Sequence, residues 1–208
     1  MRTFKRTLCI LLIAALAFSM IPFTAVSSAA AELGESKEES APTGANQDVL
    51  QINDTYDLTE FADSVNNGNT YEGKTVVLNG DCTYSGDWTP IGTRDKPFKG
   101  TFYGNRHTIT IKRCLTESDY TGLFGYSKGK ITDLNVNIGK MSGADYVGGV
   151  AGHCYEIANC HVKGTAISGS SHVGGVVGFV DGEIFNCSNS CKVEGTQNYV
   201  GGITGLLR

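Results

Sequence analysis

The chain lacks the features that mark several common classes of protein. Charged residues make up only 18% of its 208 residues and the formal net charge is −4, which leaves no basic face for nucleic acid and too little charge for a coiled coil. After residue 31, no stretch reaches the ~18 consecutive apolar residues of a membrane-spanning helix. With 40% hydrophobic residues, the chain is still too apolar to be disordered as a whole.

Sequence motifs of enzymes and metal sites are scarce as well. The chain has neither His-Glu-x-x-His, which would set two imidazoles and a base on one helix face, nor a Cys-x-x-Cys pair. Asp133 aligns with Asn159 and Asn186 in the repeats described below, so this column contains one carboxylate, whereas glycoside hydrolysis needs two. We interpret the column as a stack of side chains at a corner of the fold. We therefore expect no enzymatic activity, no metal site and no cofactor. The histidines are scattered over the repeats, and we expect a corner hydrogen bond for His107.

The N-terminus has the layout of an export signal. Arg2, Lys5 and Arg6 precede an apolar run from Leu8 to Phe18, and a stretch of small residues ends at Ala31. Residues 1–31 are therefore predicted to be a signal peptide, which makes the protein secreted or displayed at the cell surface. In residues 32–48, five acidic residues face one lysine among Ser, Gly, Ala and Pro, and this composition predicts an acidic disordered linker.

One short helix is expected after the linker. Leu58, Phe61, Ala62 and Val65 follow the spacing of one helical stripe. Asparagine, aspartate and threonine precede the stripe as candidate N-caps, and Asn-Asn-Gly follows it as a stop signal. The sequence predicts a helix near 56–66 inside an N-terminal cap that spans 49–72. Because so short a helix is marginal alone, its apolar stripe must be buried on another part of the chain.

Glycine is the residue in excess, and it marks a repeat. Of the 27 glycines, 25 lie between positions 68 and 205. Gly-Leu-Phe-Gly and three later Gly-Gly motifs recur at steps of 26, 26 and 27 residues, and the glycine and aromatic residues that define them are Gly122, Phe124, Gly125, Gly148, Gly149, Gly174, Gly175, Gly201 and Gly202. Other columns keep the same step, such as Ile131, Ile157 and Ile184. The repeats run over about 121–146, 147–172 and 173–199, with a partial repeat at 200–208.

A period of 26 residues with short strands predicts an all-β protein in which each repeat is one rung of a parallel β-solenoid. We expect about five rungs over 73–208, with apolar columns inside and glycine columns at corners or at close approaches between backbones. The predicted helix would cover the N-terminal end. No polar cap follows the last partial repeat, which leaves two alternatives: the chain is a fragment of a longer protein, or another chain covers the last rung, for example by self-association.

These residues resemble a known family. Trp88-Thr89-Pro90-Ile91-Gly92, the segment from Phe98 to Ile109, Gly-Leu-Phe-Gly at 122–125 and the Val-Gly-Gly units resemble the GLUG-motif surface proteins of bacteria, over about 55–208. Such repeats are found in adhesin-like proteins and in the non-catalytic regions of bacterial immunoglobulin A peptidases. The resemblance implies a right-handed parallel β-helix at the surface of a bacterium, and it does not imply an enzyme.

The six cysteines after the signal leave three alternatives open. Cys160 and Cys187 share a repeat column, which would place their Cα atoms about 4.8 Å apart, a separation that suits a disulfide. A ladder of free thiols in the core is the second alternative, because a free cysteine packs as a small hydrophobic residue. The third alternative is a zinc site, which no Cys-x-x-Cys pair supports, with ligands drawn from Cys154, Cys160, His161, Cys187 and Cys191.

The function that best fits this sequence is a structural or adhesive module without enzymatic activity, whose partner is a glycan or protein of a host or cell wall. The alternative is a carbohydrate-binding accessory module of a larger surface protein, and a polysaccharide-processing β-helix enzyme ranks third. Trp88, Tyr84 and Tyr103 are the candidate ligand-binding residues, and Tyr120 lies in the same region. Aromatic rings in loops stack on sugar rings, although packing in the core or in a lid is the competing role for Trp88.

Overall fold

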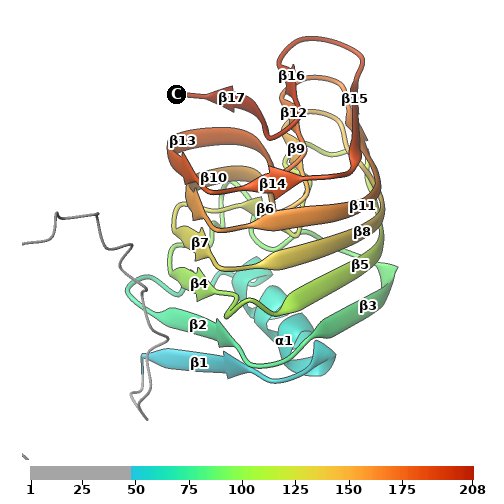
Figure 1. Cartoon of the computed structure of the whole chain (residues 1–208). Helices are drawn as coiled ribbons and strands as arrows, with labels where there is room; N and C mark the ends of the chain where they lie inside the picture. Colours follow the sequence, from blue (N-terminus) through green and yellow to red (C-terminus); the bar gives the residue numbers. More distant parts are fainter. Residues whose placement is uncertain (1–47) are drawn as a thin grey trace, which may run out of the picture. The chain divides into compact units, whose positions relative to one another are not determined.

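A computed structural model describes residues 48–208, and the predicted signal peptide and linker lie outside these residues except for Asp48. All the described residues belong to one compact unit. The chain coils around a long axis, and in Figure 1 it crosses the near side from left to right as it climbs, which makes the coil right-handed. The predicted right-handed parallel β-solenoid is therefore confirmed. No helix in the described part of the chain is both long and apolar enough to cross a membrane.

Three parallel sheets form the sides of the coil (Figure 1). The largest, sheet A, contains β1 (Val49–Ile52), β2 (Thr75–Leu78), β4 (Thr101–Tyr103), β6 (Phe124–Tyr126), β7 (Lys130–Thr132), β10 (Ala151–Ala158), β13 (Val177–Phe185) and β17 (Thr204–Leu207). Sheet B contains β3 (Cys82–Asp87), β5 (Thr108–Leu115), β8 (Asn135–Ser142), β11 (His161–Gly169), β14 (Ser188–Asn189) and β15 (Lys192–Gly195). The smallest, sheet C, contains β9 (Val147–Gly148), β12 (Val173–Gly174) and β16 (Val200–Gly201).

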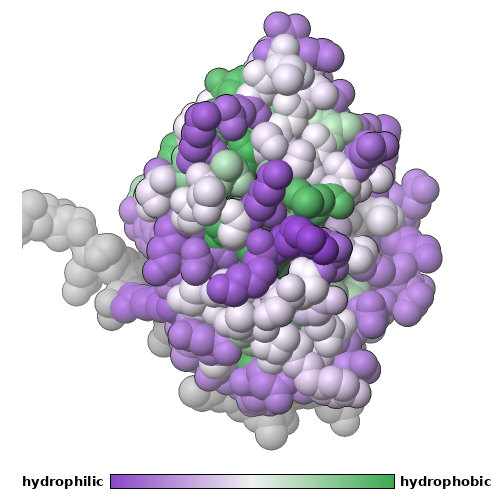
Figure 2. All heavy atoms as spheres, turned by 90° about the vertical axis from the view of Figure 1, so that its right-hand side faces the viewer, coloured by the Kyte–Doolittle hydropathy of each residue, from purple (hydrophilic) through white to green (hydrophobic). Residues whose placement is uncertain are grey.

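The strand register confirms the repeat columns. Ile131, Ile157 and Ile184 are paired neighbours across β7, β10 and β13, and Met141 pairs with Ile167 in sheet B. Their side chains point into the coil, and the first two isoleucines have no exposed surface. Outward positions in the same strands are mostly polar, although Tyr155 in β10 and Phe185 in β13 are exposed. Figure 2, which views the molecule from the right-hand side of Figure 1, shows hydrophilic residues over much of that face and hydrophobic residues only in separate small patches.

The expected number of rungs was slightly too low, because the coil has about six turns and not five. The difference arises at the N-terminal end. Residues 49–52 were assigned to the cap, but they form β1, which pairs in parallel with β2 from Val49–Thr75 to Ile52–Leu78. The solenoid therefore begins at Val49. This segment has no glycine signature, so the repeat pattern did not reach it.

The predicted helix is confirmed as α1 (Thr55–Asn66). It begins at Asp54, whose side chain accepts a hydrogen bond of 3.0 Å from the backbone N–H of Asp57. It lies across the lower end of the coil in Figure 1. Phe61 from its buried stripe packs edge-on against Phe98, with ring centres 5.6 Å apart, and also contacts Phe102. The helix thus covers the apolar interior at this end of the coil.

The repeat glycines mark close approaches between backbones. A Cβ atom on Gly148 would lie 2.3 Å from the carbonyl oxygen of Ala151 and 2.5 Å from the Cα atom of Val177. Comparable contacts under 3.0 Å surround most of the other repeat glycines, and Gly202 is the exception, with no atom within 4 Å of such a Cβ. None of these glycines has a positive φ. The left-handed corners are occupied instead by polar and aromatic residues.

One corner is a ladder of stacked polar side chains, as expected from the sequence. Asp133, Asn159 and Asn186 have φ values of 55°, 52° and 48°. The Nδ2 group of Asn186 donates to Oδ1 of Asn159 at 2.8 Å, and that of Asn159 donates to Oδ1 of Asp133 at 3.2 Å. Asparagine and aspartate tolerate this conformation better than other residues with a side chain. The column is therefore structural, and no cluster of carboxylates forms on it.

Candidate functional site

The most distinctive surface of the coil carries two columns of aromatic rings. The first column has one ring per rung at a left-handed corner, where the φ values are 60°, 60°, 54° and 61°, and consists of Tyr120, Tyr146, His172 and Tyr199. Successive rings are stacked, with centres 4.8, 4.5 and 4.7 Å apart. These distances match the spacing between strands in a sheet, roughly 4.7–4.9 Å. The column is therefore a direct product of the repeat.

The second column lies beside the first. Tyr126 and His153 are stacked with centres 4.1 Å apart, and His153 is stacked on Phe179 at 5.3 Å. Edge-on contacts join the two columns, such as Tyr120 to Tyr126 at 5.0 Å. Most of the rings are half-buried, so they present edges and polar tips to solvent while their faces contact one another.

The sequence contained a signal for the first column that was not recognised. Each of the four rings lies two residues before the first glycine of a repeat motif, as Tyr146 does before Gly148. The constant offset was hidden because one member is histidine and because tyrosine was considered only as a loop residue. The expectation that His107 makes a corner hydrogen bond is met, since its Nδ1 lies 3.3 Å from Oδ1 of Asp81.

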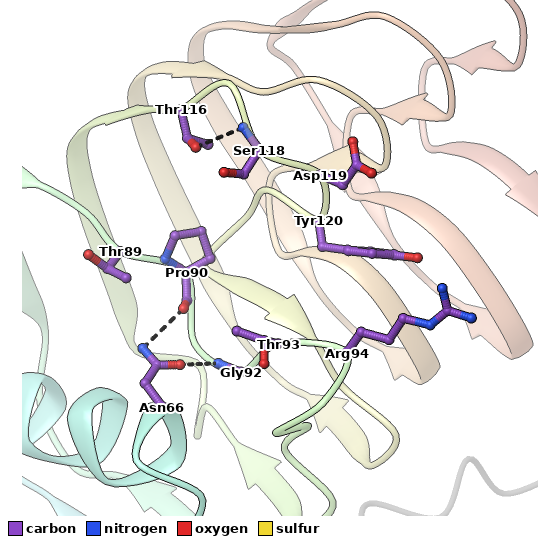
Figure 3. Close-up of a pocket in the computed structure, with 10 residues that line it drawn as sticks. All are labelled: Asn66, Thr89, Pro90, Gly92, Thr93, Arg94, Thr116, Ser118, Asp119 and Tyr120. Atoms are coloured by element: carbon purple, nitrogen blue, oxygen red, sulfur yellow. Dashed lines mark hydrogen bonds between the residues drawn. The ribbon is translucent and has the colours of Figure 1, made fainter.

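A pocket of about 360 Å³ lies at the start of the first column. Its wall is formed by the end of α1 and by the loops around 89–94 and 116–120, and its lining residues include Asn66, Pro90, Arg94, Asp119 and Tyr120. Figure 3 shows Arg94 and Tyr120 extending in the same direction from two different loops. These loops precede the regular repeats, so periodicity gave no reason to expect that they would meet.

Hydrogen bonds hold the loops of this pocket in place. The side chain of Asn66 donates to the carbonyl oxygen of Pro90 at 3.3 Å and accepts from the backbone N–H of Gly92 at 2.8 Å (Figure 3). The tip of the first loop is a tight turn closed by Thr93 and Lys96, which exchange backbone hydrogen bonds of 3.0 and 3.1 Å. Arg94 therefore projects from a fixed turn.

The charge of Arg94 affects the pKa values of two nearby tyrosines, Tyr120 and Tyr126. Desolvation raises the pKa of Tyr120 and of Tyr126 above the usual value of 10.0, and the charge of Arg94 opposes part of this rise in both. Within residues 48–208, the Arg94 side chain makes no hydrogen bond and no ion pair. Arg113 provides a contrast, because its guanidinium is already paired with the carboxylate of Asp87.

Of the three aromatic residues that were candidates for ligand binding, the structure brings Trp88 and Tyr84 together and places Tyr103 on another sheet. Trp88 is only 5% exposed, and its Nε1–H donates to the carbonyl oxygen of Leu123 at 2.9 Å. Tyr84 is half-buried and packs edge-on against Trp88, with ring centres 5.1 Å apart. Tyr103 lies in β4, on a different sheet. Trp88 therefore has the packing role that competed with ligand binding, and its indole offers no open face to a sugar.

The cysteines of the described chain are free thiols. Cys160 and Cys187 occupy adjacent rungs, next to the paired residues His161 and Ser188, and their side chains contact each other. Burial raises the pKa of Cys160 far above its usual value, whereas the hydrogen bond from Cys160 lowers the pKa of Cys187. In the described residues, no group of three or more His, Cys, Asp or Glu side chains converges on a common point where a metal ion would bind.

Comparison with known protein families agrees with the repeat pattern. Residues 169–194 match the family model of the GLUG motif. This segment covers one rung, from the end of β11 to β15, and the match confirms the GLUG repeat that the sequence resembled. Searches among curated proteins and among solved structures gave no match.

Proposed function

We propose that this protein is an exported surface protein of a bacterium that acts as a structural or adhesive module and catalyses no reaction. The observation that carries the proposal is the continuous parallel pairing of the rungs in sheet A, from β1 to β17, around an apolar core. Such a stack is stiff, and each rung contacts only its neighbours. The interior is filled by side chains, so any partner must bind the outer faces or the ends.

The GLUG repeat supports the surface location, and the predicted signal peptide supports export. The test is a comparison of the native cell with a strain that lacks the gene. Intact cells treated with an added protease should lose the protein, and the deletion strain should adhere less to the surface that the parent colonises. Reintroducing the gene should restore adhesion. Recovery of the full protein only from the cytoplasm would contradict the proposal.

A carbohydrate-binding module is the second candidate, and the pocket beside Tyr120 favours it. The pocket combines an aromatic ring, hydroxyl groups and Arg94, whose side chain has no partner in the described part of the chain. The distinguishing experiment incubates the purified protein with polysaccharides and measures both retention and the release of reducing ends. Retention without turnover supports a binding module, whereas sustained release of reducing ends supports an enzyme.

Self-association through the last rung is part of the proposal. Large hydrophobic side chains are exposed there, with Tyr199 at 53% and Leu207 at 50%, and β17 is paired on one side only in the described chain. A second copy of the chain would supply strands for this open edge. Sedimentation at increasing protein concentration tests this point. A monomer at all concentrations, with or without a Leu207→Lys substitution, would contradict it.

A further inference from the structure

We infer that the pocket at the start of the first aromatic column binds the carboxylate of an acidic saccharide, with Arg94 as the residue that selects the negative charge. This inference rests on the proposed carbohydrate-binding role of the surface and names the ligand class. The argument comes from the size of the pocket, the Arg94 guanidinium that has no partner within residues 48–208, the half-buried ring of Tyr120 and the hydroxyl groups that line the pocket.

The pocket has the dimensions and the composition of a small-ligand site. Its volume of about 360 Å³ lies in the lower part of the range of such sites, roughly 300–1,000 Å³. Pro90 and Tyr120 supply apolar walls on opposite sides (Figure 3). Tyr120 is the first ring of its column, so one of its faces is stacked on Tyr146 and no ring of the described chain is stacked in parallel on the other.

Arg94 is the cationic residue that lines the pocket, and its guanidinium has no hydrogen-bond or ion-pair partner within residues 48–208. A guanidinium binds a carboxylate through two parallel hydrogen bonds, and this geometry is unused in the described structure at Arg94. The turn that carries Arg94 is fixed by the Thr93 and Lys96 hydrogen bonds, and the Nζ group of Lys96 donates to the carbonyl oxygen of Asn66 at 3.0 Å. A fixed turn reduces the entropy that would be lost when a ligand binds.

The remaining groups fit a polyhydroxylated ligand better than a simple organic acid. Ser118 and Thr89 line the pocket with hydroxyl groups that make no hydrogen bond to other described side chains or backbone groups. Asp119 uses its Oδ1 to accept from the backbone N–H of Asp145 at 3.1 Å and keeps its second oxygen as an acceptor. Sugar hydroxyls both donate and accept, so they match this mixed lining. The aromatic ring provides a surface for the C–H face of the same sugar.

The test uses oligomers of galacturonic acid as the acidic probe and the same oligomers with methyl-esterified carboxyls as the neutral probe. Titration calorimetry on the purified protein should show binding of the acid form, weakened by salt because the site is open to solvent. The methyl ester should bind at least tenfold more weakly. Equal binding of both forms, or no binding of either, would overturn the inference.

Three variants measure how much the guanidinium of Arg94 contributes to binding of the acid oligomer. Arg94→Gln should weaken binding of the acid oligomer roughly tenfold, which equals about 1.4 kcal/mol, and Arg94→Lys should recover only part of this because lysine cannot form two parallel hydrogen bonds. Arg113→Gln is the matched control, since it removes an exposed arginine that is already paired with Asp87. Arg94 is exposed at a turn, so both Arg94 variants should unfold at the same denaturant concentration as the parent. Arg113→Gln removes an exposed ion pair, and because such a pair contributes little to the free energy of unfolding, its stability should change only slightly.

Three further outcomes distinguish this inference from its alternatives and from the proposed function. If acetate binds as tightly as the oligomer, the site recognises a carboxylate and not a saccharide, and the inference fails. If the protein is found at the cell surface and promotes adhesion but the oligomers do not bind, the inference fails while the proposed function stands. If the oligomers bind but the protein is not exported, the opposite conclusion holds.

Discussion

Tyr126 and His153 lie face to face, with ring centres 4.1 Å apart and ring planes within 2° of parallel. The contact places an imidazole inside the second aromatic column, where it is 6% exposed. The Nε2 atom of His153 lies 3.4 Å from Oδ2 of Asp181, and its Nδ1 lies 3.4 Å from the carbonyl oxygen of Ser127. The surface therefore contains a buried titratable group at the centre of its stack.

The first prediction concerns the pH dependence of stability. Desolvation is the main cause that lowers the pKa of His153 below its usual value of 6.5. The unfolded chain then binds this proton more readily than the folded chain does, so the free energy of unfolding should fall as the pH drops below about 6.5. Each unit of pKa difference corresponds to about 1.4 kcal/mol. Urea unfolding at pH 7.5 and pH 5, followed by Trp88 fluorescence, measures the effect.

The variant for this prediction is His153→Phe, which copies the phenylalanine of the next rung and should reduce the loss of stability in acid. His161→Gln is its control, because His161 is exposed and lies outside both columns. An unchanged acid response in His153→Phe would show that another group causes it.

The second prediction concerns the polar corner. Asn159→Ala removes the two side-chain hydrogen bonds of the ladder and leaves alanine at a φ of 52°. We expect a loss of about 2 kcal/mol in the free energy of unfolding, from hydrogen bonds and backbone strain together. Asn159→Gly removes the same hydrogen bonds but tolerates the backbone. Denaturant titration of the pair should find the glycine variant more stable than the alanine variant, and the reverse order would contradict the strain argument.

The third prediction compares two glycines of equivalent repeats. Gly148→Ala would place a methyl group 2.3 Å from a carbonyl oxygen and 2.5 Å from a Cα atom of the next rung, so the backbone would have to shift, at a cost of about 2–3 kcal/mol. Gly202→Ala meets no atom within 4 Å and should change the stability by less than about 0.5 kcal/mol. Thermal unfolding of both variants checks the difference. Similar melting temperatures would mean that close packing is not the reason for the glycine columns.

The fourth prediction concerns the thiols. Burial raises the pKa of Cys114 and of Cys154 to about 12 and that of Cys82 to about 11, whereas the pKa of Cys187 is lowered by its contact with Cys160. Because the thiolate is the reactive form, iodoacetamide at pH 8 should label Cys187 before those three. Peptide mass spectrometry over time gives the order, and Cys187→Ser should remove the fastest site.

The same experiment addresses the alternative that the sequence left open. Protein recovered from the culture medium and analysed without reductant would lack two hydrogens if Cys160 and Cys187 were joined. In that case neither thiol would be labelled before reduction, and the predicted order would fail.

Much of the fold could be predicted because a solenoid repeats its own contacts. The spacing of Ile131, Ile157 and Ile184 was enough to predict the inner column. The alignment of Asp133 with Asn159 and Asn186 predicted the corner. The four residues of β1 could not be predicted in the same way, because they pair with β2 but share no motif with it. Strand pairing at an end is set by tertiary contacts that leave no periodic trace.

The candidate site was less predictable. Burial decides whether an aromatic residue packs or binds, and neither composition nor spacing distinguishes the buried Trp88 from the partly exposed Tyr120. The pocket brings together the end of α1 and two loops that are distant from one another along the chain. In the sequence, nothing distinguishes Arg94 from the other charged residues. Only the fold places it beside Tyr120, the first ring of the column.

The corner ladder has a consequence for how such a molecule changes length. Because Asn159 bonds to the equivalent residue one rung below and accepts from the one above, each rung offers its neighbours the same chemical interface that it receives. If a whole 26-residue unit were duplicated or deleted, adjacent rungs would still make the same contacts with each other. A gain or loss of part of a unit would break the ladder. Tandem duplication of one unit within the gene would thus lengthen the molecule by about 4.8 Å and leave its fold unchanged.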